Sequence, residues 1–142
     1  MAIFGNLFGT RKQYPPLEPT DPLAQHLNGI RQPLENFANQ VKDSLEVVPA
    51  DKTTYIFVGK PPKQFGIVWV QNGEIHNLKS LADQKGLSAV KLAKTSEELA
   101  NAYRRSEKDS RYSAKIGDCS LVVAASKTLS QDVDRIIQTV SS

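Results

Sequence analysis

The chain has 142 residues, of which 39% are hydrophobic and 23% are charged, and it carries a net charge of +3 with an isoelectric point near 9.0. This composition fits one soluble globular domain with a core of its own and excludes an intrinsically disordered chain. Cys119 is the only cysteine, which excludes an intramolecular disulfide and a cysteine-built zinc site, so we expect a cytoplasmic protein with no metal and no cofactor.

Residues 1–19 combine a short apolar tip with a proline-rich spacer. The tip has four apolar side chains at a spacing that lines one side of a helical turn: Ile3, Phe4, Leu7 and Phe8. Three prolines keep that turn from continuing into the next helix: Pro15, Pro16 and Pro19. The apolar stretch is too short and too interrupted for a signal peptide, and no run in the chain reaches the roughly 20 residues of a transmembrane helix. We predict a docking segment in residues 1–19 and a single domain in residues 20–142.

Three other interpretations of the tip stay open. In the first, its side chains fold back over a sheet edge of the same domain. In the second, they insert shallowly into a membrane with the help of Arg11 and Lys12. In the third, they pair with a second copy or dock on it, which would make the protein a homodimer.

Apolar residues recur every three or four positions over residues 21–48, which predicts helix. Gly29 and Pro33 interrupt the pattern, so we expect a short helix near 21–28 and a longer one near 33–47, or one helix kinked at the proline. A coiled coil is the weaker alternative, because it needs three or four uninterrupted heptads.

Three strands are predicted next, over residues 53–58, 65–70 and 74–78, from β-branched and aromatic residues. The Asn-Gly pair before the third strand is a strong hairpin signal. Residues 79–94 are ambiguous, because they fit one or two helical turns closed by Gly86 and then a short edge strand at 89–92.

The remaining elements alternate between helix and strand. A capping box at residues 95–98 predicts a helix that runs to about Lys108. Strands at 112–116 and 120–125 follow, joined by a tight turn. A second capping box at 128–131 opens the last helix, which has four residues on one apolar face: Val133, Ile136, Ile137 and Val140.

The predicted order is therefore α-βββ-α-ββ-α, which indicates an α+β domain. We expect an antiparallel sheet of about five strands, a meander plus a hairpin, with helices packed on it. This order resembles the small sheet-and-helix domains of secretion chaperones and the roadblock modules, although no sequence motif is shared with either.

Basic residues are concentrated in the middle of the chain, where eleven Lys and Arg stand against six Asp and Glu between Lys60 and Lys115. If they converge, they form a surface for an anionic partner: Lys60, Lys63, Arg104, Arg105, Lys108 and Arg111. The alternative is a solvated face, because bases at the end of a helix that begins with acids also fit the helix dipole. Aromatic residues make up only 7% of the chain, and no stacking platform for RNA is interleaved with the bases.

No catalytic or metal-binding arrangement follows from the spacing of the reactive residues. His26 and His76 are separated by fifty positions, Cys119 has no base placed beside it, and Asp132 with Asp134 fits the start of a helix. We predict a non-enzymatic protein-interaction module, adaptor or chaperone-like, that binds another protein through its N-terminal segment. Binding of nucleic acid or another anionic surface, such as a membrane, is the alternative, and a small enzyme that uses Cys119 or His76 ranks last.

Overall fold

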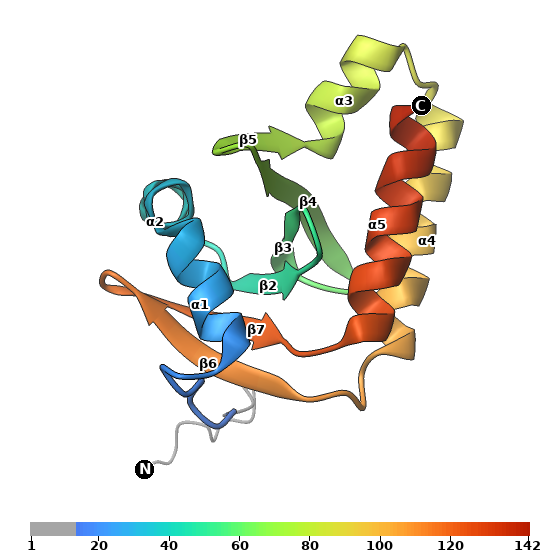
Figure 1. The fold of residues 1–142 in the computed structure, drawn as a ribbon. Helices are drawn as coiled ribbons and strands as arrows, with labels where there is room; N and C mark the ends of the chain where they lie inside the picture. The colour runs from blue at the N-terminus through green and yellow to red at the C-terminus, as the bar shows by residue number, and fades with distance from the viewer. Residues whose placement is uncertain (1–13) are drawn as a thin grey trace.

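The computed structural model describes residues 14–142, which form a six-stranded sheet with helices on both faces (Figure 1). Two short helices come first, α1 (Pro22–Gly29) and α2 (Arg31–Gln40). Four strands follow: β2 (Leu45–Pro49), β3 (Thr54–Lys60), β4 (Gln64–Gln71) and β5 (Glu74–Asn77). The last five elements are α3 (Leu78–Lys85), α4 (Ala89–Arg105), β6 (Arg111–Ile116), β7 (Cys119–Ala124) and α5 (Lys127–Ser141).

The strands lie in the order β5-β4-β3-β2-β7-β6. Neighbouring strands are antiparallel except β2 and β7, which run parallel with Val47 opposite Val123. The predicted α+β class is confirmed. The predicted sheet is corrected in two respects, since it has six strands rather than about five and is mixed rather than antiparallel.

The additional strand is β2, which the helical prediction over residues 33–47 concealed. Helix α2 ends at Gln40, and the chain becomes extended from Val41 (φ −105°, ψ 132°). Val47 and Val48 are both fully buried because helices cover both faces of the sheet at its centre. A strand buried on both faces has no alternation of apolar and polar residues, so its pattern resembles that of a buried helix.

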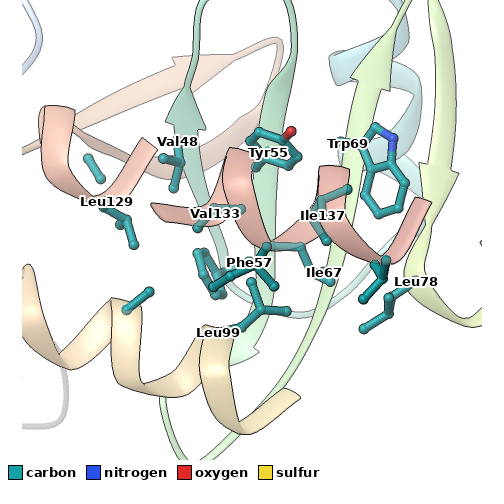
Figure 2. Close-up of a cluster of buried hydrophobic side chains, with 14 residues drawn as sticks. Val48, Tyr55, Phe57, Ile67, Trp69, Leu78, Leu99, Leu129, Val133 and Ile137 are labelled. Atoms are coloured by element: carbon teal, nitrogen blue, oxygen red, sulfur yellow. The ribbon is translucent and has the colours of Figure 1, made fainter. Parts of the chain in front are cut away.

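Each face of the sheet has its own apolar core. On one face, Leu27 of α1 and Leu34 of α2 pack with Val47 and Ile56. On the other face, helices α4 and α5 cover the aromatic residues of β3 and β4, and Figure 2 shows Leu99 and Val133 directed at Phe57. The alternation along β3 divides its side chains between the two cores.

The ambiguous stretch before residue 95 is helical. Ser88 caps α4 by accepting a hydrogen bond from the Lys91 N–H at 3.0 Å, so the predicted edge strand at 89–92 is wrong. Thr95 lies inside this helix, where its hydroxyl donates to the Lys91 carbonyl at 3.0 Å instead of capping. Likewise Ser126, rather than a residue of the 128–131 box, caps α5. In both cases a serine that precedes the predicted capping box provides the hydroxyl oxygen that accepts a hydrogen bond from a free N–H group in the first turn of the helix.

The predicted hairpin is confirmed. Asn72 (φ 55°) and Gly73 (φ 77°) form a two-residue turn with both φ angles positive, the geometry of a type I′ turn. Glycine tolerates that φ without strain, which explains the pair of residue types found there. The turn places β5 at one edge of the sheet, with Gln71 opposite Glu74.

Candidate binding surfaces

The chain enters the domain along the outer edge of β6. We call residues 14–17 the strap, because they pair with this strand in parallel orientation at one bridge. The Ser113 N–H donates to the Pro15 carbonyl at 2.9 Å, and the Leu17 N–H donates to the Ser113 carbonyl at 2.8 Å. The Ser113 hydroxyl also donates to the carbonyl of Tyr14 at 3.2 Å. The first four residues of the predicted spacer, 14–17, are therefore held by the sheet.

Two prolines in the strap limit how far this pairing extends. Pro15 and Pro16 have no N–H, so they offer no donors to a further strand. Prolines and short irregular segments are common devices for protecting a sheet edge. The tip residues Ile3, Phe4, Leu7 and Phe8 lie outside the described residues, so the docking role of the tip stays a prediction.

Arg111 does not belong to an exposed basic surface, which corrects its place in the predicted set. Its side chain is 3% exposed, and its Nε donates to a carboxylate oxygen of Glu46 at 2.9 Å. Its other nitrogens donate to Ser106 and to the Asp109 carbonyl, and its guanidinium lies 5.2 Å from the centre of the Tyr103 ring. A buried charge requires partners on all sides, and here they come from β2, α4 and the loop after it.

Tyr103 completes this buried group. Its hydroxyl donates to the other carboxylate oxygen of Glu46 at 2.7 Å. Burial and the negative charge of Glu46 raise the pKa of the Tyr103 phenol above its ordinary value. The phenol therefore stays protonated as a hydrogen-bond donor, and the cluster joins β2, α4 and β6.

The other five members of the predicted basic set are exposed but are not joined to one another. Arg105 pairs with Asp132 of α5 at 3.1 Å, and the Arg104 guanidinium donates to Asn101 at 2.8 Å. Lys60 and Lys63 lie at the β3–β4 connection, and Lys108 lies in the loop after α4. Within residues 14–142, no hydrogen bond or ion pair links the β3–β4 connection to α4. No contact among the described residues therefore joins these side chains into one shared anion site. Each of them remains a separate candidate for binding an anionic partner.

The opposite edge of the sheet, at β5, is a feature that the sequence did not reveal. His76 lies opposite Trp69 in register, and their rings stack with centroids 6.1 Å apart at 19°. Beside this stack lies a hollow of about 230 Å³ between β5 and the first turns of α3. Seven residues line it: Trp69, Ile75, His76, Asn77, Ser80, Leu81 and Gln84. The Asn-Gly signal predicted the hairpin, but strand order depends on non-local contacts that no short motif encodes.

Neither catalytic hypothesis gains support from the geometry. Cys119 and His76 lie on strands separated by four strand spacings, about 19 Å at 4.8 Å per strand. The Cys119 thiol instead lies 3.4 Å from Asn39 of α2. His26 Nε2 lies 2.7 Å from the hydroxyl of buried Thr54, and burial lowers the pKa of His26 below its ordinary value of 6.5. In residues 14–142, no group of three His, Cys, Asp or Glu side chains is arranged to hold a metal ion.

The two aspartates of α5 have structural partners. Asp134 accepts a hydrogen bond from the Tyr55 hydroxyl at 2.6 Å. Burial, together with this carboxylate, raises the pKa of the Tyr55 phenol above its ordinary value. Asp132 pairs with both Arg105 and Arg135, at 3.1 and 3.4 Å. These contacts fix α5 against the sheet and against α4.

Comparison of the chain with protein-family models, with curated proteins and with solved structures finds no match. Among the described residues, no helix has the length and apolar character needed to cross a membrane.

Proposed function

We propose that this protein is a non-enzymatic interaction module, adaptor or chaperone-like, that binds another protein through its N-terminal segment in the cytoplasm. The docking residues in this proposal are Ile3, Phe4, Leu7 and Phe8. The observation that carries it is the strap, because three hydrogen bonds with Ser113 attach the chain to the edge of β6 a few residues after the apolar tip in the sequence.

Attachment at Ser113 has a physical consequence for docking. A segment tied to a fixed point searches a limited volume, so a partner that also contacts the sheet meets it at a high effective concentration. Burying a large apolar side chain contributes about 2 kcal/mol, so the four tip residues contribute about 8 kcal/mol, against an association cost of about 4–15 kcal/mol. The strap thus supplies an anchor, the tip supplies part of the binding energy, and contacts between the partner and the sheet supply the rest.

The test compares full-length protein with a variant in which the four tip residues are changed to Ser. Because the strap begins at Tyr14, these changes leave the contacts of Ser113 in place. Affinity capture from a nuclease-treated lysate identifies the partner, and calorimetry with the purified partner then measures Kd. We expect at least a tenfold weaker Kd for the tip variant, and we expect a synthetic peptide of residues 1–19 to compete while its scrambled version does not.

Two controls define the result. Equal unfolding midpoints for both proteins show that the domain is intact. A Kd unchanged by the tip substitutions, or no competition by the peptide, contradicts the proposal.

A second candidate function is binding to nucleic acid or another anionic surface. Its supporting observation is that three exposed lysines have no ion-pair partner in residues 14–142: Lys60, Lys63 and Lys108. Such binding weakens steeply with salt because counterions are released. Changing these lysines and Arg104 to Glu, with heparin and RNA as probes at 50 and 200 mM salt, tests it, and a flat salt dependence contradicts it.

A further inference from the structure

The two edges of the sheet differ in what covers them. The strap pairs with β6, whereas no strand of the described chain pairs with the outer side of β5. In Figure 1 these edges lie on opposite sides of the molecule, with the strap beside β6 and far from β5. An edge strand with free N–H and C=O groups is a template for another strand.

The turn at Asn72 determines which main-chain groups of β5 face outward. In a two-residue hairpin, the residues that flank the turn exchange both hydrogen bonds, and the pattern then alternates along the strands. Glu74 and His76 therefore direct their main-chain groups toward β4. The N–H and C=O of Ile75, between them, point away from the sheet.

We propose that the partner of this edge is a second copy of the same chain, bound antiparallel across a two-fold axis at Ile75. In this register the two Ile75 residues exchange both main-chain hydrogen bonds. Glu74 of each copy then lies opposite His76 of the other copy, in pairs where side chains approach most closely. The sequence around Ile75 is thus complementary to itself, and this commits the edge to a second copy rather than to an unrelated strand.

The side chains of this edge are placed for such pairing. The Glu74 side chain is 78% exposed and that of His76 is 42% exposed, and both lie on the face of the sheet that carries Trp69. Stacking on the indole holds the His76 ring in place, and the Glu74 carboxylate lies 3.9 Å from its Nε2. Two copies would bring two carboxylates and two imidazoles together in alternating order, so that each carboxylate faces an imidazole rather than a second carboxylate, which would be a destabilising like-charge pair.

The strap explains why assembly stops at two copies. Pairing through β5 produces one continuous sheet whose outer strands are the β6 strands of the two copies. Each of these is covered at its centre by its own strap, which occupies the outward N–H and C=O of Ser113, so addition of a further strand is disfavoured and the symmetry is closed. Because β5 has only four residues, the interface is small, and we expect a weak dimer that depends on concentration.

The experiment uses two charge variants of the full chain, Glu74→Lys and His76→Glu. In a homodimer, the first places Lys opposite His, and the second places Glu opposite Glu. When the two variants are mixed, each interface pair contains a base opposite an acid. We expect sedimentation equilibrium to show a dimer of the native chain at high micromolar concentration and at least tenfold weaker self-association of each variant. The equimolar mixture should regain a dimer, and native mass spectrometry should show it to be a heterodimer.

Lys127→Glu, on α5 near β7, is the matched control and should dimerise as the native chain does. A native chain that is monomeric at millimolar concentration overturns the proposal, as does self-association unchanged by either variant. Loss of dimer without recovery in the mixture also overturns it, because the charge pairs then do not set the register. The tip variant with four Ser residues should still dimerise, so this test and the test of tip docking fail independently.

Discussion

The two edges of the sheet show how one fold both prevents and permits strand pairing. At β6, the strap occupies the N–H and C=O of Ser113, and its own prolines offer no donors to a further strand. At β5, Ile75 keeps both groups directed outward, and charged or titratable side chains stand on either side of it. The first edge is closed by the protein's own chain, and the second is restricted by side-chain charge.

The comparison shows that the ability of a sheet edge to bind another strand depends on the residues that surround its free main-chain groups. Proline lacks the N–H that an incoming strand needs as a donor, so it disfavours pairing with any partner. Glu74 and His76 leave those groups accessible but favour a strand that presents the complementary pair. The closed edge thus contributes to the stability of the domain, and the open edge provides the surface for its proposed association.

The largest expected effect concerns the buried ion pair that holds β6 from inside. Arg111→Ala leaves the Glu46 carboxylate buried without its guanidinium partner, and breaking such a pair costs about 3–5 kcal/mol. We expect this loss in the free energy of unfolding from urea denaturation. Hydrogen exchange should rise in β6 and the strap more than in β4 and β5, which would sharpen the contrast between the edges.

The control for Arg111 replaces both charges with apolar side chains of similar volume. Glu46→Leu with Arg111→Met leaves no unpaired charge in the interior, and such replacements are often neutral. We expect the double variant to recover most of the stability lost by Arg111→Ala. The Tyr103 hydroxyl also loses its acceptor in this variant, so full recovery is not expected. A double variant as unstable as the single one would contradict the ion-pair explanation.

Removing the strap should convert the closed edge into an open one. A variant lacking residues 1–17 loses two main-chain hydrogen bonds and one side-chain hydrogen bond at Ser113, which together contribute about 2–3 kcal/mol. We expect that loss in urea denaturation and the appearance of species larger than a dimer in sedimentation. A variant lacking residues 1–13 keeps the strap and serves as the matched control. Equal stability and equal mass of the two truncated proteins would show that the strap does not close this edge.

Local signals in the sequence predicted the local structure well. The Asn-Gly turn, the apolar face of α5 and the strands β3, β4, β6 and β7 all depend on neighbouring residues. Strand β2 was missed because burial on both faces removes the alternation by which a strand is recognised. Its parallel pairing with β7 joins residues about 75 positions apart, and no local pattern specifies such a contact.

The candidate sites were predictable only in part, for the same reason. Arg111 appeared as one of many exposed bases, although its partner Glu46 lies 65 positions away in the sequence. Lys60, Lys63 and Lys108 are exposed as predicted, but convergence is a property of the fold. That β5 is an edge follows from the order of six strands, so the open edge and its self-complementary pair were not visible before the fold was known.

The smallest expected effect lies where the chain continues from the strap into α1. His26 of this helix contacts Thr54 of β3, and burial lowers the pKa of His26 below 6.5. The folded protein therefore favours the neutral ring, whereas the unfolded chain takes up a proton near pH 6.5. Stability from this residue is present above pH 6.5 and is lost as pH falls through the lower pKa of the folded state.

A glutamine in its place, His26→Gln, keeps a donor for the Thr54 hydroxyl but does not titrate. We expect the free energy of unfolding of the native chain to fall more between pH 7.5 and pH 5.0 than that of the variant, measured in urea at both values. Equal falls would mean that protonation of His26 is not linked to folding. A larger fall for the native chain would show that protonation of His26, in the helix that follows the strap at the closed edge, is linked to the folding of the domain.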